Sequence, residues 1–114
     1  MHELSVAQNI IEIVKENVPE KDLGNVKTIF LEVGEFSGII PDSLEYCFDV
    51  IKADASLGNS KMEIKKIPFV LFCAACKSET TNNMGIRFCE KCNSSNTRII
   101  SGTDMQIINV ELES

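Results

Sequence analysis

The first hydrophobic pattern in the chain predicts an amphipathic helix close to the amino terminus. Apolar residues recur at intervals of three and four, which places them on one helical face; they are Leu4, Ala7, Ile11, Val14 and Val18. Ser5 and Gln8 have the spacing of a capping box, so we expect the helix to begin only a few residues from the terminus. Pro19 cannot donate the next helical hydrogen bond, so the helix should end near Val18.

An alternating pattern then predicts a strand over residues 26–33, which are rich in β-branched and apolar side chains. One face of this strand is formed by Ile29, Leu31 and Val33. The segment that follows contains Gly34, Gly38 and Pro41, which predicts a loop before the next element.

A second helix is predicted from Pro41, Asp42 and Ser43, which together form a helix-start signal. Its apolar residues lie at offsets of three, four and seven and are Leu44, Cys47, Phe48 and Ile51. We interpret Cys47 as a buried, unactivated thiol on the apolar face, because no adjacent basic residue in the sequence would activate it.

Two further strands are predicted in the second half of the chain, one around residues 62–65 and one over residues 104–112. The alternation of the last strand slips at Ile107 and Ile108, which indicates a central position in the sheet or a β-bulge. The intervening segment suggests a long hairpin whose connection has been replaced by a separate module. We therefore predict an α+β fold, with a small sheet of about three strands packed with two helices and an inserted module.

Composition and charge limit the classes of function. The 114 residues are 44% hydrophobic and 25% charged, which matches one folded domain with room for a smaller module. The net charge of -6 disfavours a protein that grips nucleic-acid phosphates. No stretch approaches the roughly 18 to 20 apolar residues of a membrane span, and no basic region followed by an apolar one opens the chain. We expect a cytoplasmic protein without a membrane partner.

The five cysteines carry the strongest chemical signal. Four of them form two CxxC knuckles, Cys73 with Cys76 and Cys89 with Cys92, separated by twelve residues. Two knuckles complete a tetrahedral thiolate site without an open position, which is typical of a structural zinc ribbon. A redox pair is the competing interpretation, but neither knuckle opens a recognisable βαβ-type helix.

The module around these knuckles has the features of a ribbon. Residues 69–72 and 97–100 have the pattern of ribbon strands, and so small a module needs zinc to fold. Zinc ribbons often bind nucleic acid, but the basic residues between the first and last knuckle cysteines are only Lys77, Arg87 and Lys91. Phe88 is the sole aromatic residue there, so no basic stripe with interleaved aromatic residues is formed.

The amino terminus is a possible chelator. His2 is the only histidine in the chain, and it lies beside the free α-amino group of Met1. The Met1 amine, the His2 backbone nitrogen and the His2 ring nitrogen can bind one metal in two fused rings. Nitrogen ligands in a plane suit Ni(II) or Cu(II), whereas zinc gains nothing from planarity.

The order of these motifs resembles the HypA/HybF family, the nickel accessory proteins of hydrogenase maturation. The motifs are a Met-His-Glu-Leu-Ser start on an amphipathic helix, the strand end Val33-Gly34-Glu35-Phe36-Ser37, and paired CxxC knuckles before a closing strand. The resemblance covers essentially the whole chain. It implies a nickel-binding α/β domain at residues 1–67 and 103–114, with a zinc-ribbon domain inserted at residues 68–102.

The resemblance also implies ligands and partners. Nickel would be bound by His2 with the Met1 amine and nearby backbone nitrogens, and Glu3 would add its backbone nitrogen or its carboxylate. Zinc would be held by Cys73, Cys76, Cys89 and Cys92. The implied partners are a GTPase of the maturation pathway and the large subunit of a nickel-iron hydrogenase, with a urease role left open. Some relatives carry histidines beside the knuckles, so a role built on them is doubtful here, where Lys77 and Asn93 stand.

We therefore predict a nickel metallochaperone, with structural zinc and transferable nickel, rather than an enzyme. The rival interpretations are a zinc-ribbon module that binds nucleic acid and a structural adaptor whose helices dock a partner. An enzyme is least favoured, because the sequence holds no second histidine, clustered acid pair or glycine-rich phosphate loop.

Overall fold

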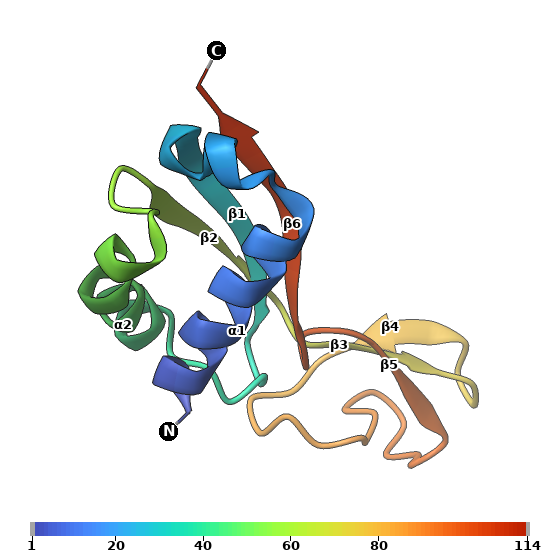
Figure 1. Cartoon of the computed structure of the whole chain (residues 1–114). Coiled ribbons are helices and arrows are strands. Elements are labelled where there is room, and N and C mark those ends of the chain that lie inside the picture. Colours follow the sequence, from blue (N-terminus) through green and yellow to red (C-terminus); the bar gives the residue numbers. More distant parts are fainter. Residues whose placement is uncertain (1, 114) are drawn as a thin grey trace. The chain divides into compact units, whose positions relative to one another are not determined.

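The computed structural model of the chain describes residues 2–113 and forms two compact units (Figure 1). The first unit comprises Met1–Glu32, Ile39–Lys65 and Gln106–Ser114, and the second comprises Val33–Gly38 and Lys66–Met105. The chain therefore passes between the units four times. Among the described residues, no helix has both the length and the apolar character that crossing a membrane requires.

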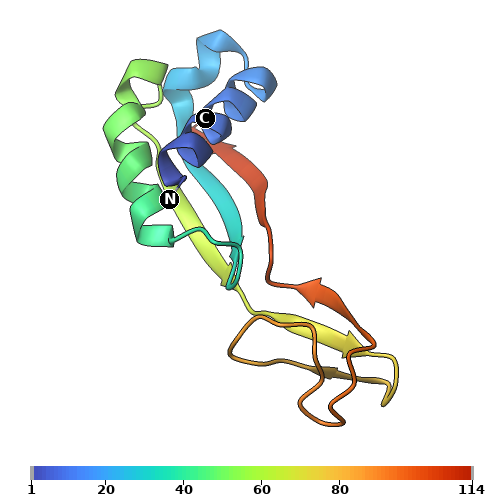
Figure 2. The ribbon, with the colours of Figure 1, turned by 90° about the horizontal axis from the view of Figure 1, so that it is seen from below.

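The first unit contains two helices packed on one face of a three-stranded sheet (Figures 1 and 2). The helices are α1 (Glu3–Asn17) and α2 (Pro41–Ile51), and the strands lie in the order β2 (Lys61–Ile67), β1 (Val26–Gly34), β6 (Met105–Leu112). This architecture confirms the predicted α+β class. The predicted inward face of β1 is also confirmed, because Ile29, Leu31 and Val33 are all fully buried.

The predicted hairpin between the second and last strands is wrong, because β1 lies between β2 and β6. The Glu113 N–H donates to the Asn25 carbonyl at 2.8 Å and the Gly34 N–H to the Asp104 carbonyl at 2.8 Å. These bonds join opposite ends of β1 and β6, so the two strands run antiparallel. β6 is thus an edge strand rather than a central one. Its apolar residues on both faces are only partly covered, and Ile108 remains 49% exposed.

Helix α1 starts earlier than its sequence signal indicated. It begins at Glu3 with His2 as the N-cap residue, so the predicted capping box of Ser5 and Gln8 lies inside the helix and is wrong. The buried face also differs from the predicted stripe: Leu4 is 48% exposed, whereas Ile10 is fully buried. The predicted end near Val18 is confirmed, since the helix closes at Asn17.

The connections add two short 3-10 helices that the sequence pattern did not predict, η1 (Glu20–Asn25) and η2 (Ala53–Ala55). Helix α2 begins at Pro41, as predicted, and buries Leu44 and Phe48. Cys47 is half-buried rather than buried, because it lies at the margin of the apolar face. The expectation of a fully buried thiol was therefore wrong in degree.

The second unit contains a three-stranded antiparallel sheet in the order β4-β3-β5. Its strands are β3 (Val70–Cys73), β4 (Ser78–Thr80) and β5 (Thr97–Ser101). The two predicted ribbon strands correspond to β3 and β5, whereas β4 was not predicted. Phe69 and Leu71 are fully buried and form the small core of this unit.

Residues 33–38 pack within the second unit through Glu35 and Phe36. The Glu35 carboxylate accepts a hydrogen bond from the Phe69 N–H at 3.1 Å. The Phe36 N–H donates to the Gly102 carbonyl at 2.8 Å. The Phe36 ring packs edge to face on the Phe69 ring, with 5.3 Å between the ring centroids. A side chain at Gly34 would place its Cβ 2.4 Å from the Gly102 backbone, so this crossing requires glycine.

Candidate metal sites

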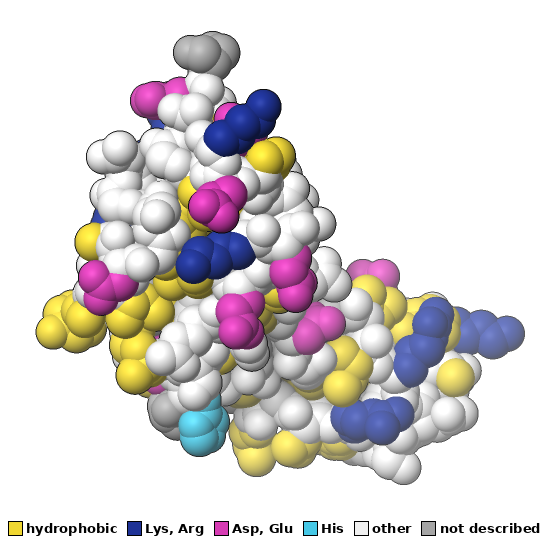
Figure 3. All heavy atoms as spheres, viewed as in Figure 1, with side chains coloured by type: hydrophobic (Ala, Val, Ile, Leu, Met, Phe, Trp, Pro, Cys, Tyr) yellow, Lys and Arg dark blue, Asp and Glu magenta, His cyan; other side chains and the backbone are white. Residues whose placement is uncertain are grey.

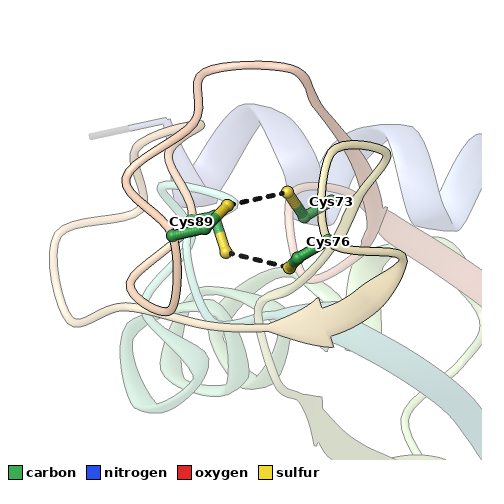
Figure 4. A group of neighbouring side chains, drawn as sticks. Cys73, Cys76 and Cys89 are labelled. Carbon is green, nitrogen blue, oxygen red and sulfur yellow. Dashed lines mark hydrogen bonds between the residues drawn. The ribbon is translucent and has the colours of Figure 1, made fainter.

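The four cysteines of the two CxxC knuckles converge in the second unit. Cys73 ends β3, Cys76 lies in the turn that leads to β4, and the other two cysteines lie in the loop before β5. All four sulfur atoms lie within 4.8 Å of one another. Figure 4 shows the sulfurs of Cys73, Cys76 and Cys89 directed toward a common point between the knuckles. The structure therefore brings together the four sulfur ligands that the sequence predicted.

The sulfur positions fit a tetrahedral zinc ion. Cys73 Sγ lies 3.6 Å from Cys92 Sγ, and Cys76 Sγ lies 3.8 Å from Cys89 Sγ. Zinc–thiolate bonds of about 2.3 Å in a tetrahedron separate the sulfurs by about 3.8 Å. The donor set consists entirely of thiolates and leaves no position for substrate or water. Such a site suits a structural ion rather than catalysis.

Backbone hydrogen bonds set the shape of the knuckles. The Asn93 N–H donates to the Cys89 carbonyl at 2.8 Å, and the Cys89 N–H donates to the Ser94 carbonyl at 2.9 Å. The residue after each knuckle adopts a left-handed conformation, with φ of 56° at Lys77 and 63° at Asn93. Asparagine tolerates this conformation far better than lysine does. These are the two positions where the resemblance placed histidines in some relatives.

The thiols do not share one environment. The Ser78 hydroxyl, 3.1 Å from Cys76 Sγ, lowers the pKa of the Cys76 thiol to about 7, with smaller help from the other three sulfurs. The Ser94 amide lowers the pKa of Cys92, but the neighbouring sulfurs, first that of Cys73, and burial outweigh it and raise this pKa to about 12. Of these two thiols, Cys76 is therefore the one that ionises more readily near neutral pH.

The loop before the second knuckle is held by Asn82, a residue that the sequence analysis did not single out. Asn82 is buried, and its side-chain Nδ2 donates to the Ile86 carbonyl at 2.7 Å. Its Oδ1 accepts hydrogen bonds from the backbone N–H groups of Met84 and Ile86. Arg87 then donates from Nη2 to the Thr97 carbonyl at 2.8 Å. Asn82 and Asn83, followed by Gly85 two residues later, form a turn signal that could have indicated this role.

The proposed nickel residues lie in the first unit, at the start of α1. The His2 side chain is exposed, and the His2 carbonyl accepts the first helical hydrogen bond, from the Val6 N–H at 2.9 Å. Met1, the predicted source of the amine ligand, lies outside the described residues. The structure therefore presents the imidazole at the surface, next to the start of the chain.

The side chain of Glu3 has a structural partner that the sequence did not reveal. Glu3 is only 6% exposed, and its Oε2 accepts a hydrogen bond from the Ile40 N–H at 3.1 Å. Ile40 is the N-cap residue of α2, so this bond ties the first turn of α1 to the entry of the second helix. Among residues 2–113, the four cysteines are the only group of three or more His, Cys, Asp or Glu side chains placed to bind one ion.

Comparisons with known proteins identify the family that the chain matches. Residues 1–112 match the model of a family described as "Hydrogenase/urease nickel incorporation, metallochaperone, hypA". The chain is 38% identical to the hydrogenase maturation factor HypA of Desulfatibacillum aliphaticivorans, covering 98% of this chain and 87% of the relative. It is also 38% identical to the factor of the same name from Trichodesmium erythraeum, and this match covers 99% of this chain and 96% of that relative.

Solved structures show the same fold. A solution structure described as that of HypA protein superposes with a TM-score of 0.71 at 23% identity, covering 99% of this chain and 97% of the other. The solution structure of the Ni metallochaperone HypA from Helicobacter pylori gives a TM-score of 0.69 at 23% identity. This match covers 98% of this chain and 97% of the other.

Proposed function

The chain belongs to the HypA family of nickel metallochaperones, and we propose that it binds Ni(II) at its amino terminus and delivers the ion for maturation of a nickel-iron hydrogenase. The resemblance drawn from the sequence motifs is thereby confirmed. We include urease as a second possible recipient because the family description names it. Family membership disfavours the nucleic-acid-binding and adaptor alternatives.

The observation that carries this proposal is the exposed His2 at the start of α1. We assign the nickel ligands to the Met1 amine, the His2 backbone and ring nitrogens, and the backbone nitrogen of Glu3. The first N–H groups of a helix have no helical carbonyl as acceptor, so deprotonation of the Glu3 amide breaks no helical hydrogen bond. The Glu3 carboxylate is a weaker candidate, because it is buried and accepts from the Ile40 N–H.

The Met1 amine and the two His2 nitrogens form a planar set of three ligands, and so open a site leaves a face of the ion accessible. A recipient can then approach one face and exchange its own ligands for those of the terminus, as transferable cargo requires. Nickel displaces protons from the amine and from peptide nitrogens, so its binding should weaken as the pH falls. Copper(II) should compete in vitro, following the divalent-metal affinity series.

We assign a structural Zn²⁺ to Cys73, Cys76, Cys89 and Cys92, supported by the sulfur separations and by the all-thiolate donor set. We retain the division into a nickel-binding domain (residues 1–67 and 103–114) and an inserted zinc-ribbon domain (residues 68–102). The zinc site stabilises the ribbon and takes no part in chemistry. The protein is thus a carrier in the cytoplasm rather than an enzyme, and its partners are a maturation GTPase and the hydrogenase large subunit.

The test is a nickel titration of zinc-loaded protein with a native amino terminus, followed by calorimetry and by absorption of the Ni(II) d–d bands. We expect one nickel per chain, a planar low-spin spectrum and an unchanged zinc content. Displacement of zinc by nickel without a second binding event would contradict the proposal, because the cysteines would then be the nickel site.

A further inference from the structure

We propose that the outer face of α2 is a docking surface for a basic amphipathic helix of a partner protein. The surface consists of an apolar ridge, Tyr46 and Val50, beside an acidic strip, Asp42, Glu45 and Asp49. That the partner takes part in nickel transfer rests on the proposed function, whereas the docking itself does not.

The ridge is an apolar surface that the fold of the first unit leaves uncovered. Tyr46 is 71% exposed and Val50 is 60% exposed. They lie four residues apart and therefore side by side on the helix, whereas Leu44 and Phe48 are fully buried on the other side. Figure 3 shows hydrophobic side chains gathered at the surface over α2. A ridge with this spacing fits the groove between side chains of a second helix.

The acidic strip determines the charge of the partner. Asp42, Glu45 and Asp49 are all exposed, and α2 contains no basic residue within its bounds. The nearest cation, Lys52, lies 3.2 Å from Asp49 and donates to the Ser60 carbonyl at 2.8 Å. Lys52 is therefore held at the end of the helix, and α2 itself supplies no cation to Asp42 and Glu45. A partner helix with lysine or arginine beside its apolar face would match this arrangement.

The charge of the first unit also argues against two other occupants of this surface, a second copy of the chain and an anionic membrane. The first unit carries thirteen Asp and Glu residues against six Lys residues. A second copy of the chain that docked through the same ridge would bring two acidic strips together, which is repulsive. An anionic lipid surface would be repelled for the same reason.

The ridge belongs to the unit that carries the proposed nickel terminus. The hydrogen bond from the Ile40 N–H to the Glu3 carboxylate fixes the entry of α2 to the first turn of α1, directly after His2. A partner seated on α2 is thereby held on the same compact unit as the cargo. Docking would raise the local concentration of the acceptor at the terminus without using any nickel ligand for recognition.

The experiment titrates isotope-labelled, zinc-loaded full chain with a synthetic amphipathic helix of leucine and lysine, followed by amide chemical shifts. The matched probe replaces every lysine with glutamate. We expect saturable shifts at Tyr46, Val50 and the acidic strip with the basic peptide, and none with the acidic one. The double variant Y46S/V50S should weaken binding about tenfold or more, as loss of apolar anchors does. D42K/E45K should weaken it by a similar factor.

The control variant is I108S/L112S, which removes two exposed apolar side chains of β6 in the same unit. It should bind the basic peptide as the unmodified chain does. Equal binding of both peptides, shifts centred on β6, or full affinity in Y46S/V50S would overturn the proposal. Dimerisation of the unmodified chain through α2, or its binding to anionic vesicles through Tyr46 and Val50, would overturn it as well.

The nickel titration tests the nickel site independently of the docking surface. Y46S/V50S should bind nickel as the unmodified chain does, and His2→Ala should bind the peptide normally. Loss of peptide binding with intact nickel binding in the unmodified chain would refute only the docking surface. Normal docking with no nickel at the terminus would refute only the nickel site.

Discussion

The Glu3 carboxylate accepts a hydrogen bond from the Ile40 backbone N–H at 3.1 Å, across 37 residues of sequence. This bond connects the residue after the exposed histidine to the N-cap position of α2. It gives the Glu3 side chain a role in positioning the terminus, and it favours the backbone nitrogen as the Glu3 contribution to nickel binding.

Glu3→Gln should therefore retain the nickel site. The amide oxygen of glutamine can still accept the Ile40 N–H, and the backbone nitrogen is unchanged. Glu3→Ala removes the acceptor and should lower the urea midpoint of unfolding. Both variants should bind one nickel ion in a calorimetric titration. Loss of nickel from Glu3→Gln at unchanged stability would make the carboxylate a ligand instead.

His2→Ala should abolish nickel binding, because the chain has no other imidazole. The His2 side chain is exposed and makes no capping hydrogen bond, so the free energy of unfolding should change by no more than about 0.5 kcal/mol. Metal analysis and urea unfolding measure the two effects on one sample. A mutant that also lost zinc would show that the two metal sites are not separate.

Extension of the chain by one glycine before Met1 should weaken nickel binding strongly. The extension moves the primary amine one residue away, so the amine and His2 can no longer form the same pair of fused chelate rings. The zinc content and the amide spectrum of the second unit serve as internal controls. An unchanged nickel affinity would remove the Met1 amine from the ligand set.

In zinc-free protein whose amide spectrum still shows the folded ribbon, alkylation should reach Cys76 before Cys92. The thiolate is the reactive form, and the pKa of Cys76 is about 7 whereas that of Cys92 is about 12. The rate of iodoacetamide labelling at Cys76 should therefore rise with pH through about 7, as measured by mass spectrometry of peptides. Ser78→Ala removes the main cause of the lowered pKa and should shift this midpoint upward. Earlier labelling of Cys92 would contradict the assignment.

Lys77→Gly should stabilise the zinc-loaded protein by about 0.5–1 kcal/mol. Lys77 has a left-handed φ of 56°, which is strained for a lysine and unstrained for glycine. Lys91→Gly is the matched control, because Lys91 is an exposed lysine of the second knuckle without a positive φ. The control should be neutral or destabilising in urea unfolding. Equal effects of the two substitutions would mean that the left-handed conformation costs nothing.

The sequence predicts features that depend on local spacing. The interval between cysteines within each knuckle brings two sulfurs to one cluster, and the alternation of Ile29, Leu31 and Val33 marks the buried face of β1. The proline signal also places the start of α2 correctly, at Pro41. Each of these signals lies within a few residues of the feature that it describes.

Features that depend on distant contacts could not be predicted in this way. Contacts between distant segments decide whether β1 lies between β2 and β6 or whether those two strands pair directly. The alternation of apolar and polar residues fits both strand orders equally well. The partner of the Glu3 carboxylate lies on another helix, and the partner of the Glu35 carboxylate lies on the linker before β3. The start of α1 at Glu3 likewise goes with a distant contact, the bond of the Glu3 carboxylate to Ile40, which the local capping pattern at Ser5 does not reveal.

The two ends of the ribbon segment meet. The Ser101 hydroxyl donates to the Pro68 carbonyl at 2.8 Å, so the chain enters and leaves the segment between them at almost one point. An insertion whose two ends lie this close can become longer or shorter, or be exchanged, while the residues on either side of it keep their positions. The part of the ribbon between Pro68 and Ser101 is thus open to variation in evolution or in design, as long as Phe69 and Gly102 keep their hydrogen bonds to Glu35 and Phe36.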